Sequence, residues 1–105
     1  KDYSTAKYYY EKYIEDGGEL TPAVYNQIAS CHIKIGEYEE AIPYLELGLK
    51  YAHNDMMRIM LKNEIIAYEY MGDFDNALEK LKSYIRAYPN DKEAKKEETF
   101  LLSRQ

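Results

Sequence analysis

Apolar residues recur at three- and four-residue spacing along most of this chain, and short breaks divide the pattern into six segments. That spacing places apolar side chains on one face of an α-helix. The breaks contain glycine or proline, which end helices or precede them. The pattern therefore predicts an all-α chain of about six helices, at about residues 1–15, 22–35, 38–52, 56–71, 74–88 and 91–103.

Several breaks carry helix-start signals. Thr21 can cap the second helix through its hydroxyl, and Pro22 suits the first helical position because no amide is needed there. We expect Asn54-Asp55 to cap the fourth helix. Asn90, followed three residues later by Glu93, resembles a capping box for the sixth.

The chain also repeats itself. Residues 36–41 (GEYEEA) and residues 72–77 (GDFDNA) share the order Gly, acid, aromatic, acid, polar, Ala at an offset of 36 residues. A partial third copy at residues 2–6 keeps the acid, the aromatic residue and Ala at an offset of 35. Periodicity in this range is typical of stacked helical repeats.

The repeat resembles the tetratricopeptide repeat, a helix-turn-helix unit of about 34 residues. The family pattern has an aromatic residue, a Leu-Gly or Leu-Ala pair and Tyr on its first helix, then Ala, a large apolar residue, a small residue and Pro on its second. The residues that fit are Tyr25, Ile28, Ala29, Gly36, Tyr38, Ala41, Leu45 and Gly48, and then Leu61, Tyr68, Gly72, Phe74, Ala77, Leu81 and Pro89. The departures are His32, His53, Glu64-Ile65 and Tyr84.

The resemblance implies a right-handed α-α superhelix, a solenoid of antiparallel helix pairs that forms one domain over residues 1–105. Residues 1–16 would be the second helix of a partial repeat. Complete repeats would occupy residues 22–55 and 56–90. Residues 91–105 would form a polar C-terminal capping helix or open a further repeat. Because the chain begins inside a repeat and without Met, we expect a bacterial-type domain fragment of a longer protein.

Composition narrows the function classes. The 105 residues carry a formal charge of −5, which argues against a nucleic-acid partner, since that requires a concentrated basic patch. No apolar run approaches the roughly 20 residues that cross a bilayer, so no membrane insertion is expected. The single Cys excludes an internal disulfide. The compartment is unknown, although a soluble, cytoplasmic protein is favoured.

Nothing in the sequence supports catalysis, a cofactor or a metal. Cys31 and His32 are adjacent on a helix and point about 100° apart, so the thiol and the imidazole do not meet. Acidic pairs such as Glu39-Glu40 lie at helix starts, where the helix dipole favours them. One Cys and two distant His residues do not make a zinc set. We therefore expect a protein that is not an enzyme.

The family resemblance implies a protein-interaction scaffold or adaptor that holds another protein's peptide or helix in the groove of its stacked first helices. Carried over by alignment, the groove residues are Asn26, Ser30, Ile33, Lys34, Lys62, Asn63, Ile66 and Tyr70. Ser30 stands where a carboxylate-clamp Asn would be, so a clamp for peptide tails is not predicted. The alternative interpretation is that these residues only form a solvent-exposed concave face that binds no ligand.

A second hypothesis is self-association into a homodimer, or a structural spacer role within a larger multi-repeat protein. The first predicted helix lacks the partner helix of its own repeat. Its apolar face would therefore be covered by a neighbouring helix on one side only. The residues of that face are Tyr3, Ala6, Tyr10 and Ile14. Burial of apolar area is worth about 25 cal/mol per Å², so such a face could drive weak pairing.

Overall fold

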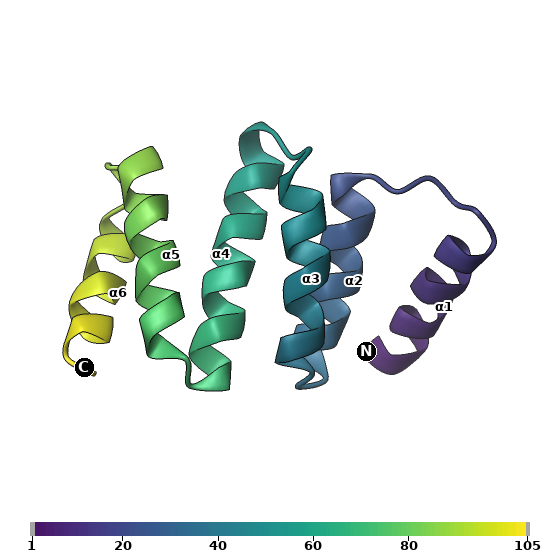
Figure 1. Ribbon diagram of the computed structural model, residues 1–105, viewed down its shortest axis with the longest axis horizontal. Coiled ribbons are helices and arrows are strands. Elements are labelled where there is room, and N and C mark those ends of the chain that lie inside the picture. The colour runs from purple at the N-terminus through teal and green to yellow at the C-terminus, as the bar shows by residue number, and fades with distance from the viewer. Residues whose placement is uncertain (1, 105) are drawn as a thin grey trace.

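Six α-helices follow one another in a single row in the computed structural model, which describes residues 2–104 (Figure 1). The predicted ends at residues 1 and 105 lie outside the described residues. No strand occurs in residues 2–104, so the predicted all-α solenoid is confirmed. The helices are α1 (Tyr3–Glu15), α2 (Pro22–Lys34), α3 (Tyr38–Leu49), α4 (Asn54–Met71), α5 (Phe74–Ala87) and α6 (Lys92–Leu102).

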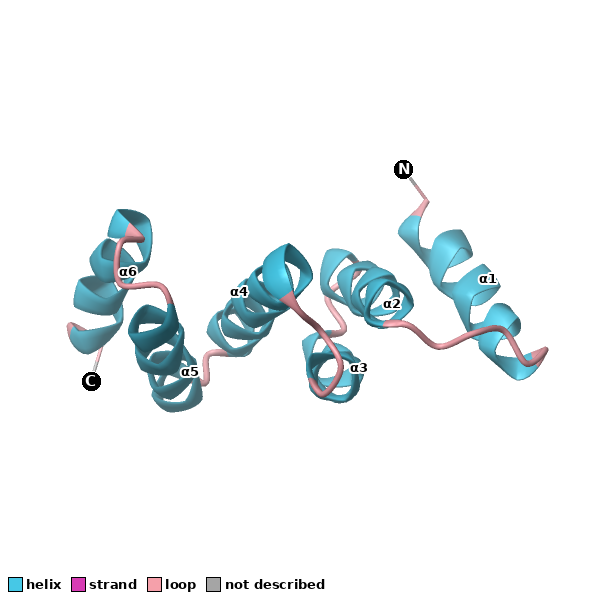
Figure 2. Cartoon of the chain, turned by 90° about the horizontal axis from the view of Figure 1, so that it is seen from above, coloured by secondary structure: helices cyan, strands magenta, loops and turns pink. Residues whose placement is uncertain are grey.

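The row is elongated. Its extents are 44 × 26 × 21 Å, and its radius of gyration is 14.3 Å, against about 13 Å for a compact chain of this length. Each helix packs most closely on its neighbours in the sequence, and the backbone of α2 also approaches that of α4. Figure 2 shows α2, α4 and α6 along one side of the row, with α3 and α5 along the other. The first helices of successive pairs therefore share one face.

The apolar core is divided between the helix pairs, as expected when repeats bury their surface against neighbours. One cluster joins α2, α3 and the start of α4, and the other joins α4, α5 and α6. The buried members of the first are Ala29, Ala41, Leu45, Ala52 and Met60. Those of the second are Ile65, Ala77, Leu78, Leu81, Tyr84, Ala94 and Leu101.

The repeated turns have the same backbone shape. Gly36 and Gly72 take left-handed conformations, with φ of +84° and +79°, which other residues rarely adopt. The predicted start of α2 is also confirmed, because the Thr21 hydroxyl accepts the Val24 amide at 3.2 Å and Pro22 is the first helical residue. The helix-turn-helix pairs are thus specified by local sequence.

The predicted cap of α4 is wrong. The helix begins at Asn54 itself, two residues earlier than predicted, with His53 at the capping position and no side-chain cap bond. Asn54 has a φ of +53°, in the left-handed region that Asn tolerates better than most residues. A local backbone conformation therefore replaces the expected side-chain cap.

The capping box predicted for α6 is also wrong. Pro89 and Asn90 form a turn, so the capping position moves one residue along to Asp91. The Asp91 carboxylate accepts the amide of Ala94 at 3.0 Å. The end of α3 also differs from the prediction, because α3 ends at Leu49 and not at residue 52.

Candidate functional site

A groove lies between α2 and α4 on the face shared by the first helices. It encloses about 380 Å³ and is lined from both helices and from the first residue of α3. Six of the eight predicted groove residues meet here, and we call this site the α2–α4 groove. Its lining consists of Ser30, Ile33, Lys34, Tyr38, Asn63, Ile66 and Tyr70.

An amide pair links the two helices at the edge of this groove. The Asn63 side-chain NH₂ donates to the Asn26 carbonyl oxygen at 2.9 Å. The Asn63 carbonyl oxygen and the Asn26 NH₂ have no protein hydrogen-bond partner within residues 2–104. Those two groups can bond to the carbonyl and amide groups of a peptide backbone.

Aromatic and charged groups complete the groove. The rings of Tyr38 and Tyr70 stack with centroids 5.2 Å apart and planes 14° apart, and Tyr70 remains 65% exposed. Lys34 is exposed and forms no ion pair within the described residues. The groove therefore combines an apolar wall with a cation that no carboxylate of the described chain neutralises.

Lys62 does not join these residues. Its ammonium lies 3.3 Å from the Asp91 carboxylate and 5.6 Å from the centre of the Tyr84 ring. It lines a separate hollow of about 300 Å³ between α4 and α6, which shares Ile66 with the α2–α4 groove. Lys62 therefore pairs with Asp91 in this hollow, with 48% of its side chain exposed.

Asp91 is the centre of a polar network that ties α4, α5 and α6 together. Its carboxylate accepts hydrogen bonds from the Tyr84 hydroxyl at 2.7 Å and from Arg58 at 3.0 Å. The Tyr84 hydroxyl also accepts a hydrogen bond from Arg58, at 2.8 Å. The bonds from Tyr84, the Ala94 amide and Arg58 hold the pKa of Asp91 well below its usual range.

The hollow between α4 and α6 also contains a pair of carboxyl groups, those of Glu69 and Glu97. Burial raises the pKa of Glu69 to about 8, and a hydrogen bond with Glu97 adds to the shift. Both side chains line this hollow with Glu93. The sequence left open whether residues 91–105 form a cap or open a further repeat, so this wall was not predicted. The period of the two repeats, continued past Pro89, is the signal that places α6 beside α4. Tyr38 was missed because it was assigned to the turn motif.

The buried polar residues that attracted attention in the sequence have structural partners. His32 is buried, its Nδ1–H donates to the Glu37 carboxylate at 2.9 Å, and its ring stacks on that of Tyr44. Glu37 also receives the Lys7 ammonium at 3.0 Å, which joins α1 to the turn before α3. Burial raises the pKa of Cys31, which disfavours the thiolate that a nucleophile requires.

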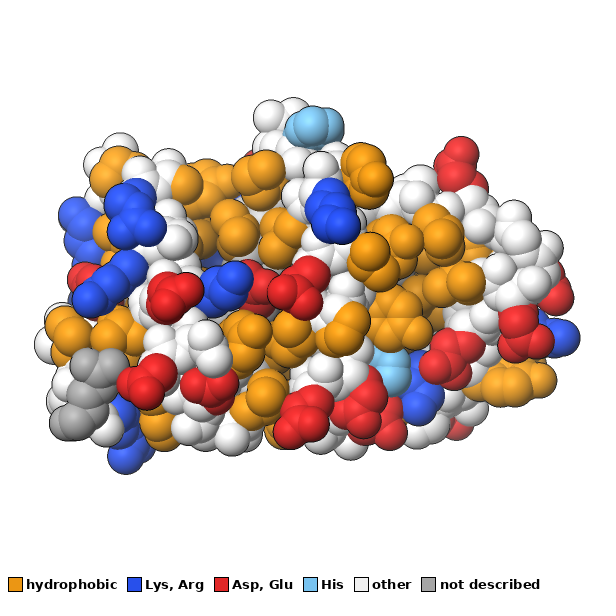
Figure 3. Space-filling view, viewed as in Figure 1, with side chains coloured by type: hydrophobic (Ala, Val, Ile, Leu, Met, Phe, Trp, Pro, Cys, Tyr) orange, Lys and Arg blue, Asp and Glu red, His pale blue; other side chains and the backbone are white. Residues whose placement is uncertain are grey.

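The predicted self-association residues lie on α1. Tyr3, Ala6, Tyr10 and Ile14 are all half-buried. Ala6 and Tyr10, together with Tyr9, Tyr13 and Val24, line a hollow of about 530 Å³, which we call the α1 hollow. Figure 3 shows hydrophobic side chains gathered where α1 meets α2 and α3, and Lys and Arg side chains at the α5–α6 end.

Residues 2–104 contain neither a cluster of metal ligands nor a membrane-spanning helix. Within residues 2–104, no three His, Cys, Asp or Glu side chains come together as a metal set. None of the helices in the same part of the chain has both the length and the apolar character to cross a bilayer.

Comparison with known proteins places the repeats. Two tetratricopeptide-repeat family models match the chain, one over residues 22–55 and the other over residues 65–91. The first match contains the α2–α3 pair, and the second runs from within α4 to the end of the turn after α5. A search of curated proteins found no match. The matched residues make up more than half of the sequence, so this chain belongs to the tetratricopeptide repeat family.

Proposed function

We propose that this chain is a protein-interaction module whose α2–α4 groove holds a short segment of another protein. Tetratricopeptide repeats generally mediate protein–protein interaction or scaffolding, which gives the class of function. The observation that carries the finer proposal is the convergence of Ser30, Lys34 and Asn63 with an apolar wall in one groove.

The groove suits a particular chemistry. The Asn63 carbonyl oxygen can accept a peptide amide, and the Asn26 NH₂ can donate to a peptide carbonyl. Ile33 and Ile66 offer an apolar surface for one anchoring side chain. A volume of about 380 Å³ lies within the range of about 300–1,000 Å³ that bound ligands usually occupy.

The charge of the groove selects the segment further. Lys34 is a free cation on a chain whose net charge is −5. A carboxylate of the bound segment, from Asp, Glu or a chain end, would therefore lie beside Lys34 with an apolar residue next to it. Partners with a basic residue at that point are disfavoured by like-charge repulsion.

Selection from a phage-displayed peptide library, with the whole 105-residue chain as bait, tests this proposal. A selected peptide is then synthesised and its affinity is measured by fluorescence anisotropy. We expect an acidic group beside an apolar residue in the selected peptides. The Lys34→Glu variant should bind at least about tenfold more weakly, the loss typical of a desolvated charge contact replaced by repulsion.

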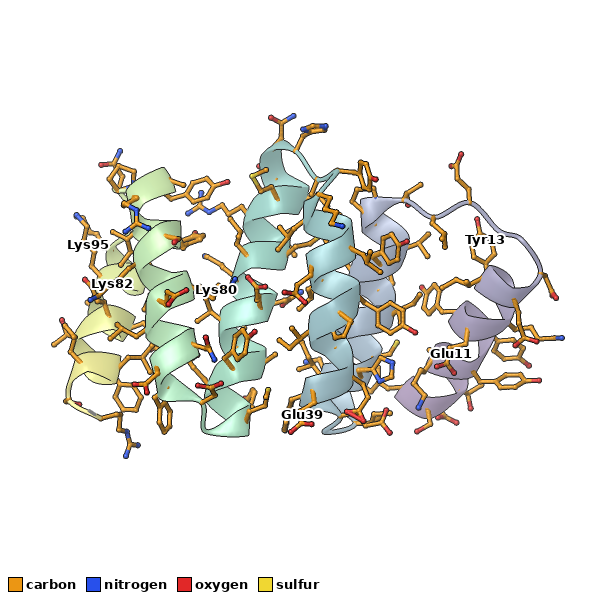
Figure 4. All side chains as sticks on the ribbon, viewed as in Figure 1. Glu11, Tyr13, Glu39, Lys80, Lys82 and Lys95 are labelled. Atoms are coloured by element: carbon orange, nitrogen blue, oxygen red, sulfur yellow. The ribbon has the colours of Figure 1, made fainter. Side chains whose placement is uncertain are left out.

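Lys82→Glu is the matched control, because Lys82 is exposed on α5 and lines none of the three hollows described above. In Figure 4 Lys80 extends from α5 toward α4, where it pairs with Glu64, whereas Lys82 lies on the other side of α5. Lys34→Gln separates lost attraction from added repulsion. Equal losses for Lys34→Glu and Lys82→Glu would show a non-specific charge effect and would contradict the proposal.

A further inference from the structure

We propose that two copies of this chain associate through the α1 hollow, with their α1 helices antiparallel about a two-fold axis. This interface is separate from the α2–α4 groove and involves none of its residues. In the repeat register, α1 is equivalent to α3 and α5, the second helices of the two complete repeats.

The residues of the α1 hollow are exposed at positions that the other repeats bury. Ala6 is half-exposed, whereas its equivalents Ala41 and Ala77 are both 0% exposed. Tyr13 is 43% exposed, whereas its equivalent Tyr84 is 1% exposed. In α3 and α5 the covering surface is the first helix of the same repeat. No helix within residues 2–104 covers α1 in that way.

The α2–α3 pair shows how such a seat is filled. The α2 residues Tyr25, Ile28, Ala29 and His32 have the spacing i, i+3, i+4, i+7, as do the facing α3 residues Ala41, Tyr44, Leu45 and Gly48. Because the helices are antiparallel, large residues lie opposite small ones. Tyr25 packs against Gly48, where an added Cβ would lie 3.1 Å from the Tyr25 Cβ.

The stripe of α1 that lines the hollow has this same spacing, and the spacing is unchanged when the helix direction is reversed. Its members are Ala6, Tyr9, Tyr10 and Tyr13. Two antiparallel copies therefore place Ala6 of each chain opposite Tyr13 of the other, and Tyr9 opposite Tyr10. Large residues again face small ones at both ends of the stripe. The α1 helix of one copy can therefore pack into the α1 hollow of the other copy, and no different partner is needed.

The other end of the row does not offer a competing surface. Lys92, Lys95 and Lys96 are exposed on α6, and Figure 4 shows Lys95 at the α5–α6 end of the molecule. Seating α6 of a second copy on α1 would desolvate those ammonium groups against tyrosine rings, in a head-to-tail arrangement that does not close. The second copy's own α1 is the apolar surface that fits.

The area available predicts a weak interaction. Within the α1 hollow, Tyr9 and Tyr13 are 65% and 43% exposed. With about 200 Å² for each side chain, these two residues supply roughly 200 Å² per copy and 400 Å² for the pair. Stable interfaces bury about 1,200–2,000 Å², so this pairing should be reversible and dependent on concentration.

Sedimentation velocity on the whole 105-residue chain, from micromolar to millimolar concentration, tests the proposal. We expect a reversible monomer–dimer equilibrium. Tyr9→Glu should weaken it by at least about tenfold, because the interface would bury a carboxylate among rings. Tyr51→Glu is the matched control, since Tyr51 is 67% exposed against 65% for Tyr9 and lies outside the α1 hollow. It should dimerise like the parent chain.

A chain that stays monomeric throughout, or a Tyr9→Glu variant that dimerises like the parent, would overturn the proposal. The antiparallel register of the two α1 helices can be tested separately. Tyr13→Ala should weaken the dimer, and the double variant Ala6→Tyr, Tyr13→Ala should restore it, since the large and small partners have exchanged places. A double variant no stronger than Tyr13→Ala would overturn the antiparallel pairing. Far-ultraviolet circular dichroism confirms that each variant remains helical.

Discussion

Replacement of Asp91 by Ala should destabilise the C-terminal half of the molecule more than the loss of a helix cap alone. The substitution removes the acceptor for the Ala94 amide, and the absence of an N-cap side chain costs about 0.5–2 kcal/mol. It also leaves the buried Tyr84 hydroxyl without the acceptor at 2.7 Å, which costs about 1–3 kcal/mol. The Arg58 bond to the Tyr84 oxygen persists, so we expect a total of about 2–4 kcal/mol.

Urea unfolding followed by circular dichroism measures this loss, and Asp73→Ala is the matched control. Asp73 caps α5 by accepting the amide of Asn76 at 3.2 Å, but it has no Tyr or Arg partner among the described residues. Asp73→Ala should therefore cost only the cap, about 0.5–2 kcal/mol. An Asp91→Ala variant that is no less stable than Asp73→Ala would refute a stabilising role for the network around Tyr84.

Two further predictions concern packing and pH. Gly48→Ala, on α3, should cost about 1–3 kcal/mol, measured by urea unfolding, because the new methyl group would collide with the Met60 methyl and crowd Tyr25. Unchanged stability would show that the Met60 side chain moves aside within the core. Glu69, with a pKa of about 8 in the folded state and about 4.3 when unfolded, binds more protons when folded, so stability should fall as pH rises between these values. Glu97→Gln should reduce that fall, and an equally steep fall would contradict the pairing of Glu69 with Glu97.

The helical pairs could be predicted because their signals are local. The Gly-acid-aromatic motif recurs at the start of α3 and α5, and its Gly36 and Gly72 take the left-handed turn that ends the preceding helix. The spacing of the apolar residues then predicts which face of each helix is buried. The capping positions at His53 and Asp91 could not be predicted in this way, because they depend on the backbone path of the loop before each helix.

The groove was predicted through the repeat register, and Lys34 and Asn63 both line the α2–α4 groove. It could not reveal that Lys62 is engaged by Asp91, because that contact joins α4 to the start of α6, 29 residues away, across a turn whose path the sequence leaves open. The same limit hid the Glu69–Glu97 pair. Contacts between repeats therefore determine which groove residues remain free.

The Asn26–Asn63 pair shows a further limit. Both amides were predicted for the groove, but whether they bond to each other or only to a ligand depends on how closely α2 approaches α4. The observed 2.9 Å bond uses one donor and one acceptor and leaves the other two groups free. Only the structure separates these alternatives.

The most direct test of the central claim is to map amide chemical-shift changes in a ¹⁵N-labelled sample of the whole chain as a library-selected peptide is added. Binding in the α2–α4 groove predicts the largest changes at Ser30, Ile33, Lys34, Asn63 and Ile66, with the Lys34→Glu variant losing them at the same peptide concentration. Changes concentrated instead on α3 and α5, the other side of the row, would contradict the claim that this groove is the binding site.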